Sequence, residues 1–293
     1  MVTNTTSLKN LYPFESNWLD LNGRRYHYLD EGPRDAPPVV MLHGNPTWSF
    51  YYRHLIPPVS QTHRVIVPDH MGCGLSDKPQ DYPYTLDQHI RNVETLLDHL
   101  QLKDISLVVH DWGGVIGMGY ATRHPDNIAR FVIFNTAAFV LPLIPKRIRM
   151  CRPDLFGGIL VRGFNAFAGL AVYMASRHPD RMTAEVRAGY IAPYNSWDNR
   201  IAVHRFVQDI PLEADHPTRP VLVEIEAGLA QFQQHPMLIM WGGKDFCFDD
   251  HFLAEWQRRF PHAETHRFAD AGHYVVEDAH ERIVPLLQEF LSS

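Results

Sequence analysis

Short apolar runs that alternate with helical stretches set the pattern of this chain. Residues 18–32 alternate between apolar and polar side chains around Asn22-Gly23, a dipeptide that favours a two-residue hairpin turn. Beyond this hairpin the runs are continuously apolar, which is typical of parallel strands buried on both faces, and residues 86–100 have helical periodicity. We therefore predict an α/β fold with a mostly parallel, doubly wound sheet. The predicted parallel strands are residues 38–42, 64–68, 105–109, 130–134, 237–241 and 264–268.

One connection between predicted strands is far longer than an ordinary crossover. The strand-helix alternation stops over residues 139–212, and a connection of this length is uncommon unless it has structure of its own. We predict that this segment is a helical cap domain inserted over the functional site. The core domain then consists of residues 1–138 and 213–293.

The predicted cap contains an apolar and aromatic run at residues 163–175, which Asn165 interrupts and which Arg162 and Arg177 flank. A membrane-spanning helix needs about 20 apolar residues, so this run is too short and too interrupted to span a bilayer. We expect it to pack inside the cap. Contact with a membrane surface is the alternative.

Composition narrows the class of protein. The 293 residues suffice for one large domain with an insertion, and 45% hydrophobic and 20% charged residues are ordinary for a globular enzyme. A formal charge of -6 makes binding to nucleic acid unfavourable.

Residues 1–10 lack the apolar segment of a signal peptide, so we expect a cytoplasmic protein. Cys73, Cys151 and Cys247 are too scattered for a disulfide framework or a zinc site, and no histidine pair has ligand spacing, so we expect no metal.

The most informative motif is residues 107–114, an apolar run followed by His110, Asp111, Trp112 and two glycines. It predicts a strand that enters a tight turn with a carboxylate at the apex, where small residues let the following helix pack against the strand. Asp111 is then a candidate nucleophile. The alternative is that Asp111 only caps the helix at residues 112–123, since aspartate is a favoured N-cap.

Two further segments complete a candidate triad in the chain order nucleophile, acid, histidine. Asp245 follows the predicted strand at residues 237–241, and His273 follows the one at residues 264–268. An aspartate behind a histidine holds the ring in one tautomer and stabilises the imidazolium, so the pair can deprotonate water. Both groups lie past the carboxyl ends of strands, where open parallel sheets bind their ligands.

From about Tyr12 to its C-terminus the chain resembles the haloalkane dehalogenase group of α/β-hydrolases. Within that group it also resembles the β-lactone decarboxylases of bacterial long-chain olefin biosynthesis. The dehalogenase-like segments are residues 43–49, 69–77, 110–114 and 272–273, and the decarboxylase-like segments are residues 135–139, 193–201 and 241–248.

The resemblance implies that Asp111 attacks a saturated carbon and forms an alkyl-enzyme ester on an apolar small molecule. Asn45 and the indole N–H of Trp112 would stabilise the leaving anion, and His273, oriented by Asp245, would act as general base. No cofactor is implied. A decarboxylase of cis-β-lactones is favoured over a haloalkane dehalogenase, and it implies association with other olefin-pathway enzymes. A homo-oligomer is compatible with the sequence.

Two other functions stay open at this point. Epoxide hydrolases also carry aspartate at this turn, but they usually have an aromatic residue where this chain has Asn45, and they use two cap tyrosines. Tyr173, Tyr190 and Tyr194 lie in the predicted cap. The chain could alternatively be a non-catalytic binder of apolar ligands, although such proteins often lose a triad residue and this chain keeps all three.

Overall fold

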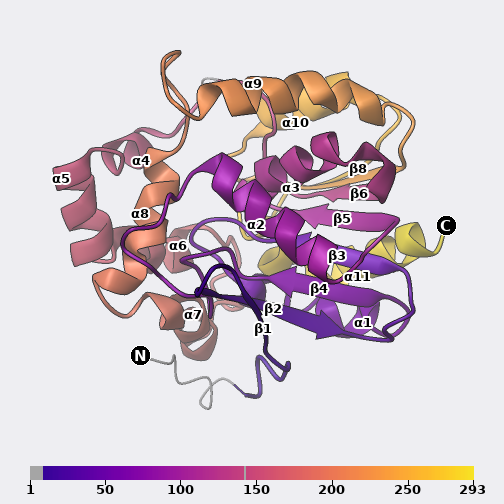
Figure 1. Cartoon of the computed structure of the whole chain (residues 1–293), viewed down its shortest axis with the longest axis horizontal. Helices are drawn as coiled ribbons and strands as arrows, with labels where there is room; N and C mark the ends of the chain where they lie inside the picture. The colour runs from indigo at the N-terminus through magenta and orange to yellow at the C-terminus, as the bar shows by residue number, and fades with distance from the viewer. Residues whose placement is uncertain (1–8, 142) are drawn as a thin grey trace.

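The computed structural model describes residues 9–141 and 143–293 and contains one eight-stranded sheet. The strand order is β1-β2-β4-β3-β5-β6-β7-β8. β2 pairs antiparallel with β1 and β4, and all other neighbours pair in parallel, so the predicted α/β architecture is confirmed (Figure 1). The strands are β1 (Asn17–Asp20), β2 (Arg25–Glu31), β3 (Pro38–Leu42), β4 (Arg64–Pro68), β5 (Ile105–Val109), β6 (Ile128–Ile133), β7 (Met237–Gly242) and β8 (Glu264–Phe268).

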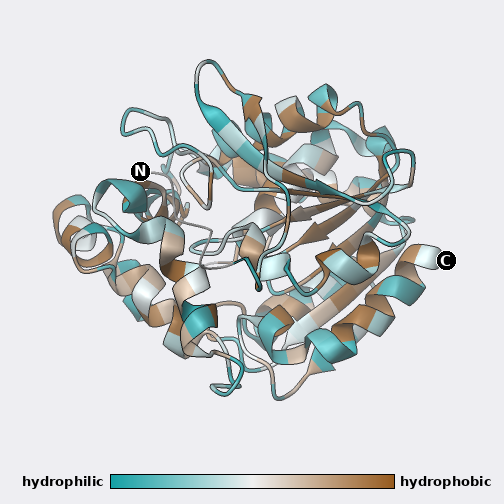
Figure 2. Ribbon diagram, turned by 90° about the horizontal axis from the view of Figure 1, so that it is seen from below, coloured by the Kyte–Doolittle hydropathy of each residue, from teal (hydrophilic) through white to brown (hydrophobic). Residues whose placement is uncertain are grey.

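Helices cover both faces of the sheet because its central strands are apolar on both sides. In β5, Leu107 and Val109 belong to one buried cluster, and Val108 between them belongs to the other. Helices α2, α3, α9 and α10 contribute to the first cluster, and α1 and α11 to the second. The central strands are coloured as hydrophobic in Figure 2. These helices are α1 (Ile56–Val59), α2 (Leu86–His99), α3 (Trp112–Arg123), α9 (Arg219–Gly228), α10 (Asp250–Arg259) and α11 (Val275–Ser292).

The hairpin forms where the sequence predicts it, and the bounds of two predicted strands, β6 and β7, differ by one or two residues. Asn22 and Gly23 have φ angles of 56° and 79°, the positive values that a type I′ turn requires at both central residues. β6 begins two residues earlier than predicted, at Ile128, because its pairing with β5 extends back to Ile105.

The long connection between β6 and β7 forms a block of short helices, seen at the left of Figure 1. Val161, Ala168, Tyr194 and Val203 form a small buried cluster within it. Other side chains of the block, such as Tyr190, join the cluster beneath α11. Its elements are α4 (Lys146–Met150), α5 (Asp154–Gly158), the π-helical turn η4 (Ile159–Gly163), α6 (Ala166–Met174), α7 (Ala184–Ile191) and α8 (Ile201–Gln208).

The chain packs closely at the corner between β5 and α3. Asp111 has φ 52° and ψ -126°, a conformation that side-chain-bearing residues rarely adopt. A Cβ atom on Gly113 would lie 2.0 Å from the carbonyl oxygen of Leu42, and one on Gly114 would lie 1.8 Å from Oγ1 of Thr136. The two glycines therefore let α3 begin directly against β3 and the loop after β6.

We expect Gly113→Ala to destabilise the protein because the added methyl group meets backbone that cannot move aside. Its free energy of unfolding should fall by about 2–3 kcal/mol, as in other overpacked sites. Gly169→Ala in α6 is the matched control, because its Cβ would meet its nearest neighbour at 3.8 Å. That variant should gain up to about 1 kcal/mol from helix propensity. Urea unfolding measures both, and equal stability of the two variants would contradict this account of the corner.

Candidate active site

The structure brings the three predicted triad residues together past the carboxyl ends of three strands. Asp111 follows β5, Asp245 follows β7 and His273 follows β8. His273 Nδ1 lies 2.8 Å from Asp245 Oδ2, which is hydrogen-bonding distance, and His273 Nε2 lies 3.8 Å from Asp111 Oδ2. The histidine therefore bonds to one carboxylate and faces the other across a gap.

Asp111 is a buried carboxylate surrounded by groups that favour its ionised form. The backbone N–H of Asn45 donates to its Oδ1 at 2.6 Å, and the backbone N–H of Trp112 also donates to the carboxylate. Burial raises the pKa of Asp111 above its usual value, while His273 and the two N–H groups oppose that rise. The two backbone N–H groups thus hold the carboxyl group of Asp111 in a fixed position.

His273 is held in one orientation by its neighbours. Burial by itself would lower the pKa of His273, but Asp245 and then Asp111 outweigh it, so that this pKa is raised. Asp245 is fixed in turn, because its Oδ1 accepts the backbone N–H of Cys247 at 2.6 Å. The ring of Phe248 stacks on His273 with centroids 6.0 Å apart.

Sequence reasoning missed two residues that support this geometry. His110 Nε2 donates to the carbonyl oxygen of His273 at 2.9 Å, and burial lowers the pKa of His110 well below its usual range, so the ring stays neutral. The hydroxyl of Thr136 donates to the carbonyl oxygen of Asp111. The position of His110 next to Asp111 was the available signal in the sequence; nothing in the sequence singled out Thr136.

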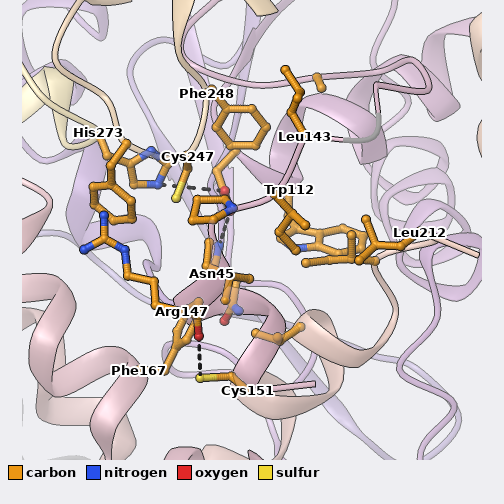
Figure 3. A pocket seen from close by; sticks show the side chains of 18 of the residues that line it. Asn45, Trp112, Leu143, Arg147, Cys151, Phe167, Leu212, Cys247, Phe248 and His273 are labelled. Carbon is orange, nitrogen blue, oxygen red and sulfur yellow. Dashed lines mark hydrogen bonds and ion pairs between the residues drawn. The ribbon is translucent and has the colours of Figure 1, made fainter. Parts of the chain in front are cut away.

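The predicted anion donors, Asn45 and Trp112, line one cavity together with Asp111 and His273 (Figure 3). Asn45 Nδ2 donates to the carbonyl oxygen of Val203 at 3.1 Å, and because an amide carries two N–H bonds, one remains for a ligand. Within the described part of the chain, the indole N–H of Trp112 has no acceptor at hydrogen-bonding distance. Both donors are therefore available to an anion in the cavity.

The loop that carries Asn45 is anchored by a buried aspartate. Asp69 Oδ1 accepts the backbone N–H of Ser49 at 2.7 Å, and its Oδ2 accepts that of Leu75 at 2.8 Å. Burial alone would raise the pKa of Asp69, but His27 and His43 beside it and the N–H of Leu75 lower it to about 2. The loop after β3 is thus tied to the loop after β4.

The cavity has a volume of about 430 Å³, within the range of small-molecule pockets. Apart from the four residues above, its wall is almost entirely apolar, which suits a substrate with alkyl groups. Most of that wall comes from the helical block and from the segment after β7. Wall residues that sequence reasoning could not assign include Phe139, Leu143, Met150, Leu160, Phe167, Leu170, Val207, Leu212, Phe246 and Phe248.

Two polar residues of the cavity wall were also missed. The guanidinium carbon of Arg147 lies 3.9 Å from the ring centroid of Phe246, at the cavity wall. Cys247 places its sulfur within 4.8 Å of ligand atoms of Asp245 and His273, a spacing that a metal ion could use. Burial raises the pKa of the Cys247 thiol well above its usual value, so the metal-binding thiolate is disfavoured there.

The cap tyrosines that epoxide hydrolysis would require lie elsewhere. The hydroxyl of Tyr190 donates to Glu277 at 2.7 Å, and that of Tyr194 donates to the carbonyl oxygen of Thr47 at 3.2 Å. Tyr173 is largely exposed, and none of the three belongs to the cavity wall described above. None of these three tyrosines can therefore donate a proton to an epoxide oxygen bound in the cavity.

Comparison with known proteins identifies the family of this chain. Residues 37–279 match the family model of the alpha/beta hydrolase fold. The chain is 50% identical to a cis-3-alkyl-4-alkyloxetan-2-one decarboxylase of Shewanella oneidensis, over 97% of this chain and 91% of the relative. It is 32% identical to a haloalkane dehalogenase of Mycolicibacterium paratuberculosis, over 91% of this chain and 89% of the relative.

Solved structures resemble the whole molecule. A haloalkane dehalogenase of Bradyrhizobium elkani superposes with a TM-score of 0.88 at 24% identity, covering 95% of this chain and 98% of its own, which shows the fold alone. The tetrameric haloalkane dehalogenase DpaA of Paraglaciecola agarilytica superposes with a TM-score of 0.82 at 27% identity, covering 100% of this chain and 98% of its own. The chain belongs to the alpha/beta hydrolase family and is an enzyme of that family, with decarboxylase and dehalogenase relatives.

Proposed function

We propose that the protein decarboxylates cis-3,4-dialkyl β-lactones with long alkyl chains to cis-alkenes, with Asp111 as the nucleophile. The observation that carries this choice is the 50% identity to a decarboxylase over nearly the whole chain, against 32% to a dehalogenase. The apolar cavity with a buried carboxylate on its wall supports the same chemistry.

In the first step, a carboxylate oxygen of Asp111 attacks the ring carbon that bears the ring oxygen. The new C–O bond forms as the bond from that carbon to the ring oxygen breaks, so the ring opens to an alkyl-enzyme ester with a free carboxylate. The Asn45 amide and the Trp112 indole N–H receive that carboxylate. Donors placed where charge develops lower the barrier, and more so in a site that excludes water.

In the second step, the released carboxylate loses carbon dioxide. The electrons of its C–C bond form the new double bond, and Asp111 leaves as a carboxylate, so the enzyme is restored without water. The first step inverts the attacked carbon, and an anti elimination in the second converts a cis-lactone to a cis-alkene. Direct attack of Asp111 on the lactone carbonyl is the alternative route, and after hydrolysis it would yield a β-hydroxy acid.

The second candidate function is haloalkane dehalogenation, with which the His273–Asp245 pair agrees. Hydrolysis of an alkyl-enzyme ester needs a base beside the ester. With 3.8 Å between His273 Nε2 and Asp111 Oδ2, the imidazole lies beside the carboxyl carbon of Asp111, where water would attack. In this reaction Asn45 and Trp112 would receive a halide. The lactone route leaves the base without an essential task.

The remaining expectations belong to the same proposal. Residues 139–212 act as the cap that closes the apolar cavity over Asp111, and neither candidate reaction needs a metal or organic cofactor. An association with the enzymes that form the lactone, and a homo-oligomer like that of the tetrameric dehalogenase relative, agree with the proposed function.

Asp111→Ala should abolish alkene formation from a synthetic cis-3,4-dialkyl β-lactone, because no other group can form and release the ester. The loss should exceed about a thousandfold, measured by gas chromatography of the products. Asp126→Ala, which removes an exposed aspartate, is the matched control and should keep full activity. A variant lacking Asp111 that still makes alkene would refute the covalent route.

The pH profile should separate the two candidate reactions. The lactone route requires only that Asp111 be ionised, so alkene formation should persist below the usual histidine pKa of about 6.5 and fall only as pH approaches the raised pKa of Asp111. A reaction that needs neutral His273 would instead already be lost as pH falls through the pKa of His273, which is raised above the usual value of about 6.5. An acid limb with its midpoint there would favour hydrolysis.

Trp112→Phe should lower kcat on the lactone by about a hundredfold with little change in KM, because it removes a donor that acts mainly as charge develops. Trp197→Phe is the control, since Trp197 is half exposed and lies away from the cavity wall. Steady-state kinetics on both variants would test the donor role. Unchanged kcat in Trp112→Phe would assign Trp112 to packing alone.

A further inference from the structure

The helical block exposes many large apolar side chains on α5, on α6 and beside them. Leu155 is 79% exposed, Phe164 76% and Tyr173 69%. Of the described large apolar residues that are exposed, most lie between residues 143 and 173; the others of this segment are Leu143, Met150, Phe156, Ile159 and Leu170. The expectation that the run at residues 163–175 packs wholly inside the cap is therefore wrong for Phe164, Leu170 and Tyr173. A concentration of this kind is unusual for a surface that faces only water.

The same segment is strongly basic, although the protein is acidic. Residues 139–177 contain six cationic side chains and one anionic side chain, a net charge of +5, which leaves -11 for the rest of the chain. Lys146, Arg147 and Arg149 are exposed, and no carboxylate of the described residues lies within ion-pair distance of them. Arg152 and Arg162 have acidic neighbours, Glu213 at 2.6 Å and Asp198 at 3.8 Å. We call the exposed part of residues 143–173 the basic apolar face.

The cavity wall reaches this face. Leu143, Met150 and Leu170 are each about half exposed, and the same residues line the cavity that contains Asp111. α4 and α5 lie at the end of the molecule farthest from the C-terminus (Figure 1). A molecule that lies against the basic apolar face is therefore next to the wall of the catalytic cavity.

We propose that the basic apolar face docks on the surface of an anionic lipid bilayer. Apolar side chains beside lysine and arginine are the composition of segments that lie in the membrane interface, where hydrophobic burial and attraction to anionic headgroups add. No single described helix has the length and apolarity of a membrane span. Asp154–Gly163 and Ala166–Met174 reach that composition only as a pair, and they meet at 61°. Such a pair can lie along an interface.

A second copy of the chain fits this face less well. In a twofold interface the same patch meets itself, so two copies of residues 143–173, each with a net charge of +4, would oppose each other. A bilayer with anionic headgroups has the opposite charge and takes up exposed leucine and phenylalanine side chains. The docking does not depend on the proposed function. The delivery of long-chain lactone from the bilayer to the cavity does rest on the proposed function.

Vesicle flotation with the full chain tests the docking. The protein should float with vesicles of phosphatidylglycerol and phosphatidylcholine, should bind pure phosphatidylcholine at least tenfold more weakly, and should lose binding as salt is raised. Absence of binding to the anionic vesicles would overturn the proposal. So would a patch-dependent dimer in sedimentation, because a second copy would then cover the face.

Two variants and their controls locate the contact. Leu155→Ser with Phe164→Ser removes apolar contact, and Lys146→Gln with Arg149→Gln removes charge; each pair should weaken vesicle binding more than tenfold. The controls are Trp18→Ser with Val223→Ser, which replace apolar residues that are about half exposed and lie outside the face, and Arg91→Gln with Lys103→Gln, which change the net charge equally. Controls that weaken binding as much as the test variants would show that the face is not the contact.

Activity separates this inference from the proposed function. The four replaced side chains of the test variants lie outside the cavity wall, so a water-soluble short-chain lactone should be turned over at the wild-type rate. Lactone supplied in anionic vesicles should be turned over at least fivefold more slowly by those variants. Vesicle binding with no alkene from either lactone would refute the function and leave the docking intact.

Discussion

The proposed chemistry depends on holding the carboxylate of Asp111 buried, ionised and fixed at a chain corner. Burial raises the pKa of Asp111, so the protein must supply donors that favour the charged form, and the backbone N–H groups of Asn45 and Trp112 do so. Those donors reach the carboxylate only because Asp111 adopts a positive φ between β5 and α3. That conformation in turn requires glycine at position 113, beneath the carbonyl oxygen of Leu42. A backbone constraint thus places the proposed nucleophile.

Buried polar contacts hold the surrounding elements in register with that corner. Arg53 and Glu277 form a buried ion pair between the loop after β3 and α11, and Tyr190 from α7 donates to the same carboxylate. Removing one member of such a buried pair leaves the other charge unpaired, so the contact strongly couples its elements. The indole N–H of Trp48 donates to the carbonyl oxygen of Gly189, which ties that loop directly to α7. The wall of the cavity is therefore fixed relative to Asp111 by contacts that themselves lie away from the reacting atoms.

The sequence predicted the local features of the site and missed those that arise from packing. Strand runs, the turn at Asn22 and the order Asp111, Asp245, His273 could be read because each depends on neighbours along the chain. The cavity wall could not be predicted, since Met150 and Phe248 meet there only through the placement of the helices. The exposure of Phe164 was missed for a related reason: an apolar run predicts burial, and sequence does not show which part of the helical block lacks a covering element.

The central claim is that Asp111 attacks a saturated carbon, and trapping the alkyl ester tests it most directly. His273→Gln lacks the proposed base for hydrolysis of an ester, and 1-iodobutane has no carboxylate to lose, so the butyl-enzyme should accumulate. Mass spectrometry of peptides from the treated variant should place one butyl group on Asp111. An unmodified enzyme, or a butyl group on the neighbouring thiol of Cys247 instead, would contradict the account.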